Sequence, residues 1–135
     1  MATKIFVNLP VQDLDRSVAF FTKLGFSFNP DFTDENATSM VVGEDIFVML
    51  LVKKFFQTFT PKPIADAHSS TEVITSLSVD SKERVDELLD IAFSAGAKPS
   101  SETQDMGWMY SRGFADLDGH LWEFAYLDIN AFPQS

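Results

Sequence analysis

The same order of local signals occurs twice along the chain. In each half, an alternating apolar segment leads to a helix-capping residue, a helical stripe, a glycine and three further strand-like segments. Aligning residues 8–11 with 76–79 superimposes the two predicted helices and places Asp13 opposite Ser81. Few side chains are identical between the halves, so what repeats is the order of structural elements. The chain is therefore expected to be a single domain, residues 1–135, built from two βαβββ modules.

The first segment, residues 4–11, predicts a strand with two distinct faces, because apolar residues recur at every second position. Its aliphatic face consists of Ile5, Val7, Leu9 and Val11. That face should pack on a helix, which leaves Phe6 and Asn8 on the other side to line a ligand site. The corresponding segment in the second half turns Ile74 and Ser76 to the equivalent side.

Each of these strands leads into a predicted helix. Asp13 is expected to cap the first helix and Asp80 the second, because a carboxylate can accept hydrogen bonds from the unpaired amides of the first turn. Gly25 and Gly96 lie where a left-handed residue would end each helix. The buried stripe of the second helix is expected to consist of Val85, Leu88, Leu89 and Ala92.

The remaining elements complete the two modules. Strands are expected over 27–32, 38–42, 46–52, 72–79, 98–103, 109–114 and 121–127, with a short helix over 55–59. Pro61, Pro63 and the polar run 68–70 interrupt the pattern. We therefore divide the chain into module one (1–53), a connector (54–70), module two (71–128) and a tail (129–135). The main alternative architecture is a single α+β sheet with helices on one face.

The composition excludes several classes of function. Twenty acidic against ten basic residues give a net charge of -10, which disfavours nucleic-acid binding because that requires clustered Lys and Arg. There is no cysteine, so disulfides, thiolate nucleophiles and Cys-based zinc sites are excluded. Neither a signal peptide nor an apolar run long enough to cross a bilayer is visible, so no membrane role is expected. A cytoplasmic protein fits this composition.

Two segments resemble the glyoxalase/bleomycin-resistance/extradiol-dioxygenase superfamily, also called the vicinal oxygen chelate family. Residues 7–26 contain the Val-x-Asp-Leu sequence at the end of the strand, an Arg-Ser pair before two aromatic residues, and a closing Leu-Gly-Phe. Residues 116–124 resemble the last hairpin and strand of the family. The resemblance spans nearly the whole chain. It implies an α+β fold in which two βαβββ modules form a curled mixed sheet around a cleft.

The resemblance also implies four positions for metal ligands. Metal-dependent members of the family place one His or Glu on the first and last strand of each module. Here those positions fall on Phe6, on Met49 or Leu50 depending on register, on Ile74 and on Glu123. Phe, Ile and Leu offer no nitrogen or oxygen to a cation. We therefore expect neither a metal site nor a cofactor.

Glu123 is the one ligand-type residue that remains, and three roles are open to it. It could pair internally with Arg112, anchor a cationic or hydrogen-bonding ligand group, or perform acid–base chemistry with a raised pKa. Tyr110 and Arg112 share a strand face, and Trp108 lies in the bend before that strand. The predicted ligand-binding residues are Phe6, Asn8, Leu50, Ile74, Ser76, Trp108, Tyr110, Arg112 and Glu123. His68 is expected to be solvated, and His120 to cap a hairpin or to meet a polar group in the core.

These observations favour a homodimeric protein that binds a small cationic or aromatic molecule and lacks the usual metal site. The alternative is a metal-dependent lyase or dioxygenase-like enzyme with relocated ligands. A module that binds another protein and no small ligand is a third hypothesis. The sequence does not decide whether a reaction is catalysed. Glu123 is the only catalytic candidate.

Overall fold

A computed structural model describes residues 3–131 of the chain. The chain divides into two compact units, one ending at Ala65 and the other beginning at Asp66. This division falls inside the segment that we interpreted as a connector. The end of the predicted tail, residues 132–135, lies outside the described residues.

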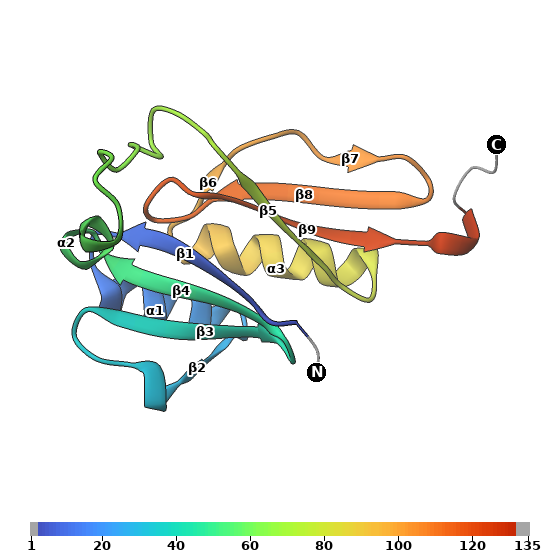
Figure 1. Ribbon diagram of the computed structural model, residues 1–135. Helices are drawn as coiled ribbons and strands as arrows, with labels where there is room; N and C mark the ends of the chain where they lie inside the picture. The colour runs from blue at the N-terminus through green and yellow to red at the C-terminus, as the bar shows by residue number, and fades with distance from the viewer. Residues whose placement is uncertain (1–2, 132–135) are drawn as a thin grey trace. The chain divides into compact units, whose positions relative to one another are not determined.

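Unit 1 is a four-stranded sheet with one long helix (Figure 1). Its strands run in the order β1-β4-β3-β2; β1 and β4 are parallel, and the other pairs are antiparallel. Its elements are β1 (Ile5–Val11), α1 (Leu14–Lys23), β2 (Ser27–Asn29), η1 (Pro30–Phe32), β3 (Ala37–Gly43), β4 (Ile46–Val52), α2 (Lys53–Phe56) and η2 (Gln57–Phe59).

Unit 2 repeats this arrangement, except that the strand at one edge of its sheet is divided into two short pieces. The order is β5-β9-β8-β6, with the short strand β7 also paired to β8, and β5 runs parallel to β9. Its elements are β5 (Ile74–Ser78), α3 (Lys82–Ser94), β6 (Lys98–Pro99), β7 (Gln104–Asp105), β8 (Met109–Ala115), β9 (Leu121–Leu127) and η3 (Ile129–Ala131). The predicted α+β fold of two repeated modules is therefore confirmed. The single-sheet alternative is wrong, because the strands form two sheets.

One face of each sheet is buried against the helix of its own unit. In unit 1 the core contains Leu9, Val11 and Leu50 from the sheet, together with Phe20 and Phe21 from α1. The predicted stripe of the second helix is confirmed: Val85, Leu88, Leu89 and Ala92 are all buried in unit 2. Each unit thus has two layers, and we call the sheet face turned away from α1 or α3 the far face.

The first helix begins as predicted, whereas the second begins one residue later than expected. The Asp13 side chain accepts a hydrogen bond from the Arg16 amide at 3.2 Å. In unit 2 the cap is Ser81, whose Oγ accepts from the Arg84 amide at 3.0 Å. Asp80 precedes the extended cap residue, so its predicted capping role is wrong. Ser81 is also the residue that the repeat places opposite Asp13.

Several other predicted boundaries differ from the structure. The strand expected over 98–103 is present only over Lys98–Pro99, and the strand expected over 72–79 covers Ile74–Ser78. The strand expected over 27–32 ends at Asn29, because Pro30 has no amide hydrogen for the ladder and begins a 3-10 turn instead. The short helix expected near 55–59 begins earlier, at Lys53. Gly25 and Gly96 adopt φ angles of 98° and 109° after their helices, as the prediction requires.

The capping assignment gives a direct test. Ser81→Ala should lower the free energy of unfolding by about 1 kcal/mol, because the Arg84 amide loses its acceptor. Asp80→Ala is the matched control and should change the stability by less than about 0.5 kcal/mol. Urea denaturation of the two variants measures both values. A larger loss for Asp80→Ala than for Ser81→Ala would contradict the assignment.

Candidate functional site

The far face of unit 1 carries an aromatic pair. Phe6 pairs with Phe47 across β1 and β4, and their rings stack with centroids 5.0 Å apart. Asn8 and Met49 form the next pair along the same face. Phe6 remains 52% exposed, so its ring is available to a ligand. The structure thus places the predicted residues Phe6 and Asn8 side by side on this face.

Leu50 does not belong to that face, which corrects its predicted place in the ligand site. It pairs with Leu9 and is fully buried on the side of α1. A shift of one residue along a strand moves a side chain to the opposite face. The parallel pairing of β1 with β4 therefore places Met49, rather than Leu50, beside Asn8.

The far face of unit 2 brings together three of the predicted residues. Ser76 of β5 pairs with Glu123 of β9, which in turn pairs with Gly113 of β8. Ile74 lies in the neighbouring row and pairs with Leu121. Ile74 and Ser76 are exposed and Glu123 is half-buried. This arrangement leaves the Glu123 carboxylate accessible at the centre of the sheet.

Tyr110 and Arg112 do share a face, as predicted, but it is the helix-covered face. The Tyr110 hydroxyl donates to Asp86 Oδ1 of α3 at 2.6 Å, and Arg112 Nη1 donates to the same oxygen at 2.9 Å. The expected Arg112–Glu123 pair is therefore wrong, because the two residues point to opposite sides of the sheet. Trp108 lies just before β8, where its carbonyl oxygen accepts from the Asp128 amide at 2.7 Å.

The Asp86 cluster ties α3 to the sheet and perturbs both titratable partners. The Tyr110 hydrogen bond, followed by the Arg112 hydrogen bond and charge, holds the pKa of Asp86 below its ordinary value, against the opposing effect of burial. The same hydrogen bond raises the pKa of Tyr110. Lys82 lies over the Tyr110 ring, 5.8 Å from its centroid. These contacts stabilise the helix–sheet packing and give Tyr110 and Arg112 a structural role.

Asp116 organises the hairpin between β8 and β9, and its role was not predicted. Its carboxylate accepts hydrogen bonds from Trp122 Nε1 at 2.9 Å and from the amides of Asp118 and His120. Burial raises the pKa of Asp116, while the nearby His120 and these hydrogen bonds act in the opposite direction. The predicted position of His120 in the hairpin is confirmed. The Asp-x-Asp-Gly sequence at residues 116–119 was the signal from which the role of Asp116 in the turn could have been predicted.

Comparisons with known proteins find a matching family profile and structures of the same fold. The profile described as "Bleomycin resistance protein-like N-terminal" matches residues 3–43. A hypothetical protein from S. aureus is 32% identical, with 93% of this chain and 95% of that chain covered and a TM-score of 0.79. Residues 3–43 thus match a bleomycin-resistance family profile, and the chain shares the fold of the glyoxalase/bleomycin-resistance/dioxygenase superfamily. No curated protein sequence matches it.

Other superfamily structures share the fold at lower identity. A glyoxalase/bleomycin resistance protein/dioxygenase family enzyme from Burkholderia phytofirmans is 17% identical, with coverage of 93% and 99% and a TM-score of 0.77. The fosfomycin resistance protein FosX from Listeria monocytogenes is 16% identical, with coverage of 97% and 98% and a TM-score of 0.70. At these identities the likeness shows the fold alone.

The residues at the superfamily's metal-ligand positions do not fit a divalent metal. With the register settled, these positions hold Phe6, Met49, Ile74 and Glu123. Phenyl and butyl side chains have no lone pair, and a thioether is a soft ligand suited to Cu(I) rather than to hard divalent ions. Residues 3–131 contain no cluster of three or more His, Cys, Asp or Glu that could hold a metal ion.

Within the same range no helix is long and apolar enough to cross a membrane.

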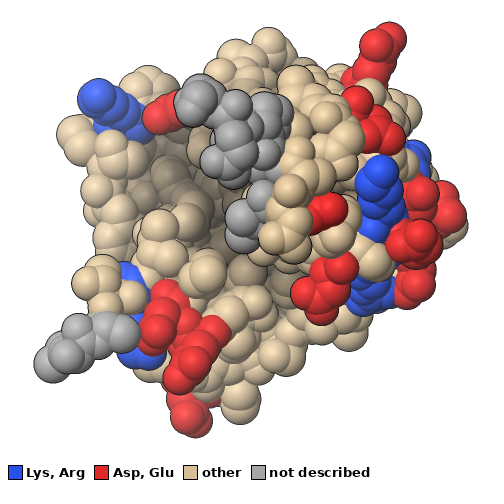
Figure 2. Space-filling view, turned by 90° about the vertical axis from the view of Figure 1, so that its right-hand side faces the viewer, with Lys and Arg blue, Asp and Glu red and all other residues tan. Residues whose placement is uncertain are grey.

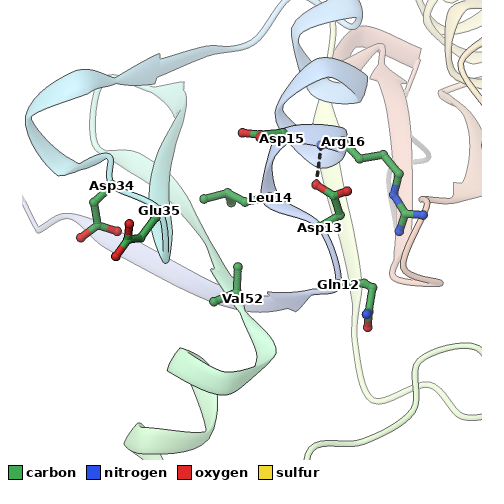
Figure 3. Close-up of a pocket in the computed structure, with 8 residues that line it drawn as sticks. All are labelled: Gln12, Asp13, Leu14, Asp15, Arg16, Asp34, Glu35 and Val52. Carbon is green, nitrogen blue, oxygen red and sulfur yellow. Dashed lines mark hydrogen bonds between the residues drawn. The ribbon is translucent and has the colours of Figure 1, made fainter.

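Acidic side chains are prominent on the surface. On the face drawn in Figure 2 the Lys and Arg side chains lie among Asp and Glu and do not gather into a basic patch. A surface hollow of about 580 Å³ in unit 1 also has an acidic rim (Figure 3). Its lining residues are Gln12, Asp13, Leu14, Asp15, Arg16, Asp34, Glu35 and Val52. None of the predicted ligand-binding residues lines this hollow.

The Asp86 cluster predicts a specific pH dependence. Because its folded pKa lies below the ordinary 3.8, ionised Asp86 stabilises the fold above that value, and this contribution is lost as the pH falls through the folded pKa. Asp86→Asn should therefore cost about 0.2–1 kcal/mol near pH 7, since the side chain is half-exposed, and much less near pH 2.

Urea denaturation at several pH values measures this difference. Asp90→Asn on the same helix is the control, because the Asp90 side chain has no hydrogen bond or ion pair with the residues that the structure describes. A cost for Asp86→Asn that stays constant down to about pH 2 would contradict the assignment.

Proposed function

We propose that this protein binds a small organic molecule on the far faces of its sheets, without a divalent metal ion. Each far face is proposed by itself: the residues that we assign to ligand contact are Phe6, Asn8 and Met49 in unit 1, and Ile74, Ser76 and Glu123 in unit 2. Trp108 remains a predicted contact. Tyr110 and Arg112 are not included, because they are committed to Asp86 on the other face.

The proposal rests mainly on Glu123, which is half-buried and forms no hydrogen bond or ion pair with any described residue. It is also the only charged side chain on the far face of β5, β8 and β9. Keeping a carboxylate partly desolvated without a partner costs free energy. An external ligand that supplies the partner accounts for this arrangement.

The aromatic pair of unit 1 supports the same proposal. An exposed Phe6 stacked on Phe47 offers a flat apolar surface of the kind that binds ligand rings. A neighbour with this fold is named a fosfomycin resistance protein, which supports a small molecule as the partner here too. We assign no reaction to the protein.

We also propose that the protein is a homodimer and acts in the cytoplasm. In their own sheets β1 and β5 are edge strands, and Ile5 and Val73 near them are exposed apolar residues, which favours association with another copy. The absence of cysteine supports a reducing compartment. Cell fractionation would test that location.

Native mass spectrometry after incubation with a metabolite extract of the host tests this function. The wild type should appear as a dimer of the 15.1 kDa chain carrying an organic adduct. Phe6→Ala and Glu123→Gln should each weaken adduct binding by about tenfold, since each removes roughly 1.4 kcal/mol of contact energy.

Phe32→Ala and Glu83→Gln are the matched controls, because both residues are exposed and lie outside the far faces. They should retain the adduct. If the wild type carries no organic adduct, or if Phe6→Ala and Glu123→Gln leave the adduct unchanged, small-molecule binding at these faces is wrong. The latter result is the one expected of a protein-binding module.

A further inference from the structure

A row of side-chain oxygens crosses the far face of unit 2 at Glu123. The pairing register places Ser76, Glu123 and Gly113 next to one another on three adjacent strands. Neighbouring strands in a sheet are about 4.8 Å apart, so the row from β5 to β8 spans roughly 10 Å. A small polar group of a ligand, together with the side chains that bond to it, would fit within this width.

Two further hydroxyls complete the row beyond Gly113. Ser100 and Ser101 lie in the break between β6 and β7. A Cβ atom added to Gly113 would lie 2.9 Å from Ser100 Oγ and 3.2 Å from Ser101 Oγ. The hydroxyls therefore fill the space where any other residue would place its side chain. Because Gly113 has no side chain, the two hydroxyls can lie directly over it, on the strand next to Glu123.

None of these polar side chains is used within the protein. Glu123, Ser76, Ser100 and Ser101 form no side-chain hydrogen bond with the residues that the structure describes. The contrast is with Asp86 and Asp116, two of the carboxylates that serve the fold. Asp86 accepts hydrogen bonds from two side chains, and Asp116 accepts one from a side chain and two from backbone amides. The row thus combines one carboxylate acceptor with hydroxyls that can accept as well as donate, and none of them is paired within the described residues.

The chemistry of the row selects the charge of a ligand. An ionised carboxylate only accepts hydrogen bonds, and each hydroxyl oxygen can accept as well. A primary ammonium brings three donors and the opposite charge, and charge-assisted bonds are stronger at a partly buried site. A carboxylate ligand would meet repulsion from Glu123, and an alcohol would bring one donor and no charge.

We propose that this row binds the ammonium group of a primary amine. The ammonium donates to the Glu123 carboxylate and to one neighbouring hydroxyl, either Ser76 on the β5 side or Ser100 or Ser101 on the β8 side. The apolar body of the amine lies on the neighbouring row, where Ile74 pairs with Leu121. This inference rests on the proposed small-molecule function and names its ligand class.

Matched ligands of different charge test the inference. The probes are benzylamine, cyclohexylmethylamine and butylamine, each with the alcohol and the carboxylate of the same carbon skeleton. Amide chemical shifts of the ¹⁵N-labelled protein report binding at each residue. The amines should give saturable shifts around Ser76, Gly113 and Glu123, and should bind about tenfold more tightly than the alcohols. The carboxylates should give no shift there.

Variants separate the contributions of the row. Glu123→Gln should remove the preference for amines over alcohols. One of two changes, Ser76→Ala or the double change of Ser100 and Ser101 to Ala, should weaken amine binding by about fivefold, as expected for one lost hydrogen bond. Ser94→Ala and Glu83→Gln are controls of the same residue types on α3, away from the far face, and should bind amines like the wild type.

The possible outcomes are distinct. Alcohols or carboxylates that bind as tightly as amines would overturn the inference and leave small-molecule binding intact. An amine preference that survives in Glu123→Gln would also overturn it. If none of the nine probes shifts these amides, the proposed amine site is wrong. Whether the protein binds any small molecule is then tested separately by the experiment with the metabolite extract.

Discussion

Each unit has one long helix for a sheet with two faces, and this constraint shapes the rest of the molecule. Alternation along the strands sorts the side chains, so that Leu9 and Leu50 pack toward α1 while Phe6 and Asn8 point away. The same helix cannot cover both sides. Burial against the helix supplies stability on one face and leaves the other face uncovered by that helix. The exposed Phe6 is a consequence of that division.

The pairing register of β8 and β9 determines that Glu123 points to the far face, away from α3. Asp116 fixes this register at the turn by holding the amides of Asp118 and His120 and the indole of Trp122. From that turn, alternation directs Arg112 toward α3 and sets Glu123 opposite Gly113 on the far face. The buried hairpin therefore determines the position of Glu123, a carboxylate that has no partner among the described residues.

The sequence predicted the fold and part of the site because its signals are local. Phe6 and Ser76 lie in segments whose alternation reveals the face of each residue. All residues from 46 to 52 are apolar, so no alternation shows which side of the sheet Leu50 faces. Its side is set by the pairing of β4 with β1, and no local sequence pattern reveals that pairing. Arg112 was assigned to the ligand site because its partner Asp86 lies on a helix, 26 residues away. Ser100 was missed because a continuous strand was expected where the chain breaks.

The central claim is that the superfamily's metal position has become a site where Glu123 meets an organic ligand. Calorimetric titration of the chelator-treated protein with Mn²⁺, Zn²⁺ and Ni²⁺ tests it most directly. Three of the four inherited ligand positions hold side chains that do not bind these ions, so the account predicts no saturable heat at micromolar protein. Binding of one equivalent of metal with a dissociation constant below about 1 μM, lost in Glu123→Gln, would contradict the account.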